Sequence, residues 1–542
     1  MTSPAPDLIV LNGNMVTMDP LIPRAEALAV SGGRIRRLGS TPEIAALKGG
    51  KTEVIDAGGR LVLPGFQDSH LHLQDSGLEF AFNIKLDRVD GIESLQRTVR
   101  DFAASHPDYP WIIGGGWNFG MFTEETLNRH VLDEAVPDRP VFLRDSSYHS
   151  AVLNTKACEA AGLTAATPNP PNGIFVRDRA GVPTGMAYEE AMQVVRQAMP
   201  ANSDAKYADG VRWAQKHCNR HGITGVLDAR VDARHMRVYR MLEEAGELTL
   251  RICATALVEP EDTVEGALER LTALRRDYAS GMLRVHSAKF FVDGIVENRT
   301  AAMLADYSDA RGGNAPLMFG ENHLRELFIA FDAARFQIHV HAIGDKGVRA
   351  ALDAMEAARD INGAWPSLHH IAHVQFIDPA DIPRFGELGV VANLQPLWAS
   401  NDRSVTEIAA GMVGPERAKY IYANRSLIEA GAPYTLSSDW GVSTLNPFPI
   451  MGTAILRQAK HMGWDTPAYN AQESIDIFQA VRGYTVNAAA ALWRDRDTGS
   501  LSAGKFADLI ILDRDIFSVP PQELFDTKVL TTMLGGRVVY SA

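Results

Sequence analysis

The central part of this 542-residue chain alternates short apolar runs with amphipathic helical segments, and this alternation most constrains the fold. Helical patterns such as VEGALERLTALRR (264–276) and HLRELFIAFDAAR (323–335) separate the apolar runs, which is typical of βαβ units in a parallel sheet. Eight runs are predicted to be strands: the one that ends in HLH at 70–72, and residues 222–229, 250–258, 285–294, 338–345, 369–377, 390–398 and 434–440. Eight parallel strands close a (β/α)8 TIM barrel, so we predict this α/β fold.

A doubly wound parallel sheet is the alternative fold for such an alternation. No G-x-G-x-x-G fingerprint opens a strand-to-helix turn in this chain. The GGGW at 114–117 lacks the helical pattern and the acidic residue that should follow it. The barrel is therefore the favoured fold.

The two ends of the chain share another pattern, in which short alternating strands are separated by Gly-Gly turns. Residues 7–62 contain DLIVLNGNMVTM, ALAVSGGRIRRLG and TEVIDAGGRLVLPG, and the C-terminal part contains GKFADLIILDRD and VLTTMLGGRVVYSA. Neither end can bury much apolar surface alone. We therefore predict that the two ends pair in one composite β-sandwich.

Residues 76–205 do not fit a count of eight strands. They contain extra strand-like runs, PWIIGGGW and PVFLRDSSYHSAVLN, and a passage rich in proline and glycine. So long a segment is not expected to be a structureless loop in a compact barrel, so we predict an inserted subdomain after the first barrel strand, on the active-site side. The expected divisions are 1–60 (β-sandwich, first part), 61–75 (barrel strand 1), 76–205 (inserted subdomain), 206–490 (barrel) and 491–542 (β-sandwich, second part).

Charge and composition argue against several kinds of partner. The net charge of −13 disfavours nucleic acids and anionic membrane surfaces, which both attract basic faces. No run reaches the ~18 apolar residues of a membrane-spanning helix, and the N-terminus lacks the pattern of a signal peptide. Three widely spaced cysteines form neither a disulfide framework nor a zinc knuckle. We expect a cytoplasmic protein that acts on a small molecule, without a nucleic-acid or membrane partner.

His70 and His72 are the first candidate site residues. They end an apolar run in LPGFQDSHLHLQDSG (63–77), and residues i and i+2 of a strand point to the same face. Two imidazoles on one face at a strand end look like a pair of metal ligands. The alternative is two hydrogen-bonded histidines of the surface or the core, and H-x-H alone does not separate the two.

Other chemically active side chains fall on or at the ends of other predicted strands, where barrels place their functional groups. These are Lys289 on the fourth strand, His341 on the fifth, His373 on the sixth and Asp439 on the eighth. Each alone has a structural explanation, such as a buried salt bridge for Lys289 or a helix N-cap for Asp439. His339 and His370 lie near these residues in the sequence but are not predicted to be ligands, and His339 lies one pleat deeper than His341. Their joint occurrence at separate strands favours a metal centre.

Several segments resemble the amidohydrolase superfamily, and within it the YtcJ-like group that includes N-substituted formamide deformylases. The resemblance is carried by LPGFQDSHLHL, AKFFVDGIVENRTAA, HVHAIGD, IAHVQFI, AGAPYTLSSDWGV and GSLSAGKFADLIILDRD. It also covers the insertion, through GGGWN and VPDRPVFLRDSSYHSAVLNTKACEAAGLT. The family combines a TIM barrel and a composite β-sandwich with a divalent metal centre, usually zinc.

The resemblance implies a ligand set and a role for Asp439. The implied ligands are His70, His72 and Asp439 for one metal and His341 and His373 for a second, bridged by a carboxylated Lys289. Asp439 is also implied as the acid/base group, and His373 is the next candidate for the base. We expect one or two Zn2+ ions per chain and, by the resemblance alone, a homodimer.

The expected reaction is hydrolysis of a non-peptide C–N bond, as in an N-substituted amide or formamide, by water that the metal activates. The same residues would serve a deaminase, a cyclic-amide hydrolase or an ester or carbamate hydrolase, and the sequence does not separate these. A non-catalytic scaffold on the same fold is disfavoured, because all six candidate ligands are present.

Aromatic side chains favour a small substrate with an apolar or aromatic arm. The candidates are Trp117, Phe119, Phe122, Tyr148, His149, Trp398 and Trp440. His149 resembles a position that the group keeps near its pocket. Arg144 and Arg299 are the candidate partners for an anionic group on the substrate. The alternative is that several of the aromatic residues only pack the insertion.

Overall fold

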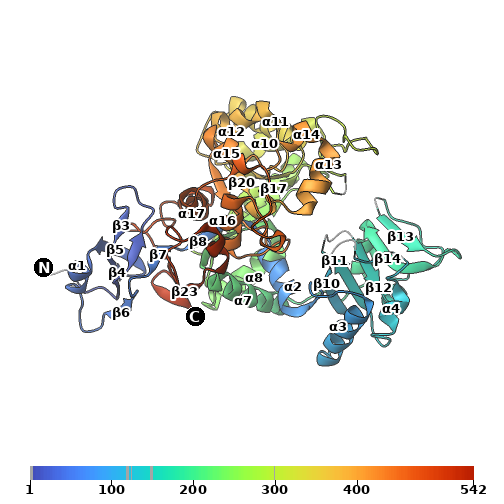
Figure 1. Ribbon diagram of the computed structural model, residues 1–542, viewed down its shortest axis with the longest axis horizontal. Helices are drawn as coiled ribbons and strands as arrows, with labels where there is room; N and C mark the ends of the chain where they lie inside the picture. The colour runs from blue at the N-terminus through green and yellow to red at the C-terminus, as the bar shows by residue number, and fades with distance from the viewer. Residues whose placement is uncertain (1–3, 118–120, 124, 147–149, 172, 298) are drawn as a thin grey trace. The chain divides into compact units, whose positions relative to one another are not determined.

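The computed structural model describes residues 4–117, 121–123, 125–146, 150–171, 173–297 and 299–542 of the chain (Figure 1). The chain forms two compact units. One unit joins residues 1–73 to residues 215–542 and contains the barrel and the sheets of both termini. The other unit consists of residues 74–214 and is the insertion.

An eight-stranded parallel sheet forms the centre of the first unit, and its strands are hydrogen-bonded in chain order. The strands are β8 (Phe66–Leu71), β15 (Ile223–Val231), β16 (Arg251–Leu257), β17 (Leu283–Phe291), β18 (Gln337–Ala342), β19 (His370–His373), β20 (Val391–Leu394) and β21 (Tyr434–Leu436). The barrel closes next to β21, where the Asp439 and His72 amides donate at 2.8 Å to the carbonyls of His70 and Trp440. The predicted TIM barrel is confirmed.

Helices connect the barrel strands and surround them (Figure 1). They are α7 (Asp204–Arg220), α8 (Ala233–Glu244), α9 (Val264–Tyr278), α10 (Glu321–Ala333), α11 (Asp345–Asn362), α12 (Ile382–Leu388), α13 (Ala410–Val413), α14 (Pro415–Ala418), α15 (Asn424–Glu429), α16 (Pro447–Leu456), α17 (Ile477–Tyr484) and α18 (Val486–Ala491). The strands β16 and β17 are buried along almost their whole length, as expected of parallel strands covered on both faces.

Two sheets built from both ends of the chain form the composite β-sandwich. One has the order β5 (Arg34–Gly39), β4 (Ala27–Ser31), β1 (Leu8–Leu11) and β6 (Glu53–Asp56); the other has β24 (Arg537–Ser541), β23 (Val529–Leu534), β22 (Leu509–Leu512), β7 (Leu61–Pro64), β2 (Asn14–Val16) and β3 (Arg24–Ala25). A short helix, α1 (Thr41–Ala45), lies in the N-terminal part. One hydrophobic cluster joins Leu8 and Val30 to Leu509 and Met533, so the two ends share a core, as predicted.

The boundary between the sandwich and the barrel lies at Gly65. Residues 61–64 were expected to begin barrel strand 1, but they form β7 and pair with β22 of the sandwich. A Cβ on Gly65 would lie 2.4 Å from the Thr224 side chain, so only glycine permits this close approach. The barrel strand therefore begins at Phe66.

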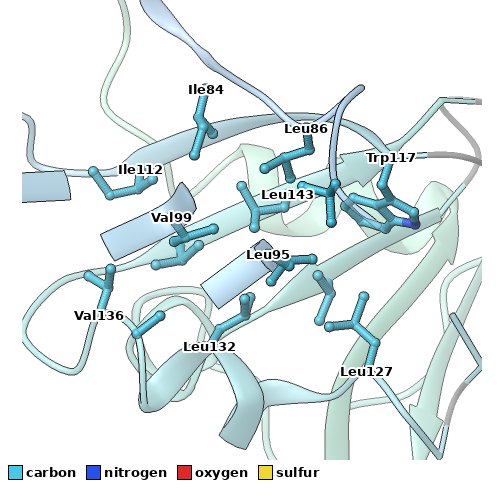
Figure 2. Packing of buried hydrophobic residues seen from close by; sticks show 14 of the residues in the cluster. Ile84, Leu86, Leu95, Val99, Ile112, Trp117, Leu127, Leu132, Val136 and Leu143 are labelled. Atoms are coloured by element: carbon cyan, nitrogen blue, oxygen red, sulfur yellow. The ribbon is translucent and has the colours of Figure 1, made fainter. Parts of the chain in front are cut away.

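The insertion is a six-stranded mixed sheet in the order β13-β14-β12-β11-β10-β9. Its strands are β9 (Ile84–Lys85), β10 (Ile112–Trp117), β11 (Val141–Asp145), β12 (Ser150–Leu153), β13 (Gly173–Arg177) and β14 (Pro183–Glu189), and its helices are α3 (Ile92–Ser105), α4 (Arg129–Asp133), α5 (Thr155–Ala160) and α6 (Glu190–Arg196), with α2 (Leu73–Phe82) at its start. Leu143 of β11 packs into a cluster with α3 and α4 (Figure 2), whereas Phe142 packs into a second cluster with α5 and α6. The sheet therefore has a hydrophobic core on each face.

Within the described ranges, no helix combines the length and the apolar character needed to cross a bilayer.

Candidate metal centre and active site

The predicted metal ligands come from the C-terminal ends of five barrel strands. His70 lies in β8 and His72 directly follows it, while Lys289, His341 and His373 lie in β17, β18 and β19. Asp439 was expected to end the eighth strand, but β21 stops at Leu436 and Asp439 lies three residues further on. The turn after β21 therefore places this carboxylate, not the strand itself.

Asp439 lies at the centre of these side chains. Its Oδ1 is 3.3 Å from Nε2 of His72 and 3.5 Å from Nε2 of His70. One potential ligand atom from each of His70, His373 and Asp439 lies within 4.8 Å of the others. The ring of His373 is also 4.6 Å, between centroids, from that of His341. The fold thus brings five of the six predicted ligands together in one cluster.

Three polar atoms of this cluster have no hydrogen-bond partner in the described part of the chain: Nδ1 of His341, Nδ1 of His373 and Oδ1 of Asp439. Burial is the largest effect on the imidazoles, and it lowers the pKa of His373 to about 4 and that of His341 well below its ordinary value. Neutral imidazoles and a carboxylate oxygen all offer lone pairs. Buried nitrogen and oxygen atoms that lack a hydrogen-bond partner suit a site for a cation.

Lys289 is the sixth predicted ligand, and it is fully buried. Its Nζ has no hydrogen-bond partner among the described residues and lies 4.7 Å from the centroid of the Phe291 ring. Burial lowers the pKa of Lys289 to about 7, although the charge of Asp439 opposes this shift. A buried ammonium without a hydrogen bond is costly, so this lysine favours an uncharged or modified form.

Two of the predicted ligand positions have unusual backbone conformations. His373 and Val374 have φ angles of 80° and 45°, and Asp439 has a φ of 50°. Residues with a Cβ adopt this region at an energetic cost, and such strain is concentrated at functional sites. Backbone hydrogen bonds from Val374 to Ala342 and from Asp439 to His70 hold these conformations.

Two buried carboxylates that the sequence prediction missed support the site. Asp68 accepts hydrogen bonds from the amides of His70 and Ser438, and burial raises its pKa to about 7. Asp293 accepts from three backbone amides, those of Ala302, Ile343 and Gly344, and burial raises its pKa to about 7 as well. The available signal was their place in the sequence: Asp68 lies within β8, two residues before His70, and Asp293 lies two residues after β17.

The residues predicted to bind the substrate lie in different parts of the structure. Trp117 is 3% exposed and belongs to the hydrophobic cluster of the insertion, where its ring is 6.2 Å from that of Phe122 (Figure 2). Phe119, Tyr148 and His149 lie outside the described residues. This burial favours a packing role for Trp117, and its predicted role in substrate binding stays a prediction.

In the barrel unit, Trp398 and Phe291 lie beside the ligand cluster. The ring of Trp398 stacks on that of His373 at 5.7 Å, and the ring of Phe291 is 5.2 Å from that of His341. Trp440 is buried and packs against His217.

The two arginines predicted to bind an anionic group of the substrate both have carboxylate partners within the protein. Arg299 pairs with Asp309 at 2.7 Å, and Arg144 pairs with Glu79 at 2.9 Å.

Comparison with known proteins agrees with this geometry. A model described as "Amidohydrolase family" matches residues 53–540. The chain is 28% identical to the putative amidohydrolase YtcJ of Bacillus subtilis, over 95% of this chain and 96% of that protein. It is 27% identical to the N-substituted formamide deformylase of Arthrobacter pascens, over 98% of each chain. A crystal structure of an uncharacterized metal-dependent hydrolase from Pyrococcus horikoshii superposes with a TM-score of 0.77 and 25% identity, over 95% of this chain and 99% of that one.

The TIM barrel, the imidazole and carboxylate groups that meet at the ends of its strands, and the similarity to a metal-dependent hydrolase over nearly the whole chain together indicate the class of metal-dependent hydrolases. The chain belongs to the amidohydrolase family, and it is a hydrolase that acts on carbon–nitrogen bonds.

Proposed function

We propose that this protein is a zinc-dependent hydrolase that cleaves the non-peptide C–N bond of an N-substituted amide or formamide. The observation that carries the proposal is Oδ1 of Asp439, which faces Nε2 of His72 at 3.3 Å and Nε2 of His70 at 3.5 Å. This oxygen has no hydrogen-bond partner in the described residues, so a cation suits the space between the three atoms. Similarity to an N-substituted formamide deformylase over nearly the whole chain supports this bond type.

Two ligand sets would hold the metal. His70, His72 and Asp439 would bind one ion, and His341 and His373 would bind a second. Lys289 would lie between them as a carbamate: its uncharged Nζ adds to carbon dioxide and one proton is released. The pKa of about 7 supports this reaction, because only the unprotonated amine adds to carbon dioxide. The reaction also replaces a buried cation with an anion that two ions can share.

The roles of the protein groups follow from this arrangement. Divalent ions at such a site lower the pKa of a water molecule and polarise the carbonyl oxygen of the substrate. Asp439 accepts the proton of the attacking water on its carboxylate and then delivers it to the nitrogen of the leaving amine. The His72 side chain beside it, which counteracts the effect of burial, holds the pKa of Asp439 below its ordinary value and keeps it ready to accept a proton. Water and amide are thereby converted to a carboxylic acid and an amine.

The walls of the site suit a small substrate with an apolar or aromatic arm. Trp398 presents its ring beside His373, and Phe291 lies beside Lys289 and His341. Aromatic rings bind apolar groups over a large area at a small cost in conformational entropy.

The test is a hydrolysis screen of the zinc-loaded enzyme against amides, formamides, cyclic ureas, amino-substituted heterocycles and esters. We expect release of an amine from N-aryl or N-alkyl formamides and amides, with the Asp439→Asn variant as the control for contaminating activity. Turnover confined to esters, to cyclic ureas or to ammonia release from amino groups would assign the same site to a different reaction.

A further inference from the structure

Three buried histidines on barrel strands have no role in the proposed function. They are His286 on β17, His339 on β18 and His370 on β19. The strand register places His339 opposite Lys289 on one side and opposite His370 on the other. Imidazoles in a fully buried layer need hydrogen-bond partners, so their contacts indicate what they do.

His339 is directly connected to a predicted metal ligand. Its Nε2 lies 2.7 Å from Nδ1 of His70, and both residues are at most 1% exposed. One of these two nitrogens must donate a proton and the other must accept it. His70 can offer a lone pair at Nε2 only when its proton is on Nδ1, so in the metal-binding form His70 donates and His339 accepts.

The other end of the His70 ring shows why this tautomer belongs to the metal-bound state. Nε2 of His70 faces Oδ1 of Asp439 at 3.5 Å. Without a metal, a proton on Nε2 would point at this carboxylate oxygen, which has no hydrogen-bond partner among the described residues. A cation between the two atoms needs the lone pair of Nε2, so it requires the proton on Nδ1, beside His339.

The ring of His339 is itself held in place. It packs against the ring of His370, which is tilted by 32° with 4.0 Å between centroids. Nδ1 of His370 lies 3.2 Å from Nδ2 of Asn393, and the same amide group donates to the carbonyl of Ser69 at 3.0 Å. Because Ser69 directly precedes His70, this network joins the backbone and the ring of the ligand residue to β19 and β20.

We propose that His339 is a positioning residue, which accepts the Nδ1 proton of His70 and so directs Nε2 of His70 towards the metal. The inference rests on the proposed metal centre. Ligand histidines usually donate their second ring N–H to a carboxylate, a carbonyl or water, and these partners orient the ring. A neutral imidazole in this role orients His70 without adding negative charge to a buried site that already contains Asp439.

Three substitutions distinguish the loss of the hydrogen-bond acceptor from the loss of the volume of the ring. In His339→Gln the amide oxygen reaches the place of Nε2 and can accept from His70, whereas in His339→Asn the amide group reaches only the place of Nδ1. His339→Leu removes every acceptor. His286→Leu is the matched control, because it also replaces a buried histidine on a barrel strand, yet Nδ1 and Nε2 of His286 have no side-chain hydrogen-bond partner in the described chain.

The readout is the affinity of the full-length protein for Zn2+, measured by competition with a chromophoric chelator after removal of bound metal. We expect the His339→Leu and His339→Asn variants to bind Zn2+ about 10–100-fold more weakly than the unmodified protein. His339→Gln should recover most of the affinity, and His286→Leu should leave it unchanged. Thermal unfolding of the metal-free variants checks folding, and if the leucine variant does not fold, the comparison of glutamine with asparagine decides the result.

Two results would overturn the positioning role. Folded His339→Leu or His339→Asn protein that binds Zn2+ as tightly as the unmodified protein would show that the contact does not matter. If His339→Leu lowers the affinity for Zn2+ as much as His70→Ala does, and His339→Gln does not recover it, His339 would instead be a metal ligand. The metal centre itself is tested separately: if the unmodified protein and His70→Ala bind Zn2+ equally, the proposed function fails as well.

Discussion

Oδ1 of Asp439 and Nε2 of His72 lie 3.3 Å apart at the point where the first and last strands of the barrel meet. Two backbone hydrogen bonds join the same segments, from Asp439 to His70 and from His72 to Trp440. Closure of the barrel and assembly of the site are therefore one structural event.

Asp439→Asn keeps the shape of the side chain but cannot accept the proton of the attacking water. We expect a folded variant with normal or modestly reduced metal content and a kcat lower by roughly 10²–10⁴, with a much smaller change in KM. Steady-state kinetics with metal analysis test this, and Asp138→Asn, at a side chain that is 70% exposed, is the control. A rate within a few-fold of the unmodified enzyme would leave Asp439 a structural residue and make His373 the next candidate for the base.

His70→Ala and His72→Ala each remove an imidazole that faces Asp439. Each variant should lose at least one metal ion per chain and all measurable turnover, because the remaining ligands leave an incomplete coordination shell. Elemental analysis of the purified proteins gives the metal content. His461→Ala, at a side chain that is 66% exposed, should retain both metal and rate. Normal metal and rate in both ligand variants would contradict the site assignment.

Lys289→Ala removes the proposed bridge and leaves a small buried space. We expect the metal content to fall and activity to be lost, with partial recovery when acetate or propionate is added, because a short carboxylate can replace the carbamate. Metal analysis and rates across a series of carboxylic acids are the measurements. Retention of full metal content and rate without any added acid would rule out the bridging role.

Trp398→Ala removes the ring that stacks on His373. Aromatic contacts contribute about 0.5–1.5 kcal/mol beyond the area they bury, so kcat/KM should fall several-fold or more for N-aryl substrates. N-methyl substrates should be affected less, and the ratio of the two values is the measurement. Equal losses for both substrates would place Trp398 outside the pocket for the apolar arm.

Arg251 and Asp508 join the barrel to the sandwich through a buried pair with contacts of 2.7 and 3.0 Å. Arg251→Leu leaves the carboxylate buried without its cation, which should lower the free energy of unfolding by about 3–5 kcal/mol. Urea unfolding monitors the change. Arg403→Leu is the control, because Arg403 belongs to an exposed helical pair with Glu407 and should cost at most about 1 kcal/mol. Similar effects of the two substitutions would mean that the buried pair adds nothing to stability.

Local sequence patterns were sufficient for most of the architecture. Eight apolar runs and the helices between them specify the barrel, and the similar patterns of the two ends predict their pairing, because hydrophobic periodicity is encoded over a few neighbouring residues. The candidate ligands could be listed for a related reason. In a parallel barrel the C-terminal ends of all strands lie on one face, so residues distant in the sequence become neighbours once the fold is known.

The sequence could not predict those features in which the position of one residue is set by contacts with residues from other strands. Residues 61–64 look like the start of the barrel strand, yet they pair with β22 of the sandwich, and the chain enters the barrel only after Gly65, which lies close to Thr224. Trp117 looks like a pocket residue but is buried in the insertion.

The role of His339 also could not be predicted from the sequence. It was not among the predicted site residues, yet its Nε2 lies 2.7 Å from Nδ1 of His70. Residue types and spacing thus determined the fold class and the ligand candidates. Strand boundaries, the burial of Lys289 and the partner of each imidazole were decided by tertiary contacts, because burial and hydrogen bonding depend on atoms that only the folded chain brings together.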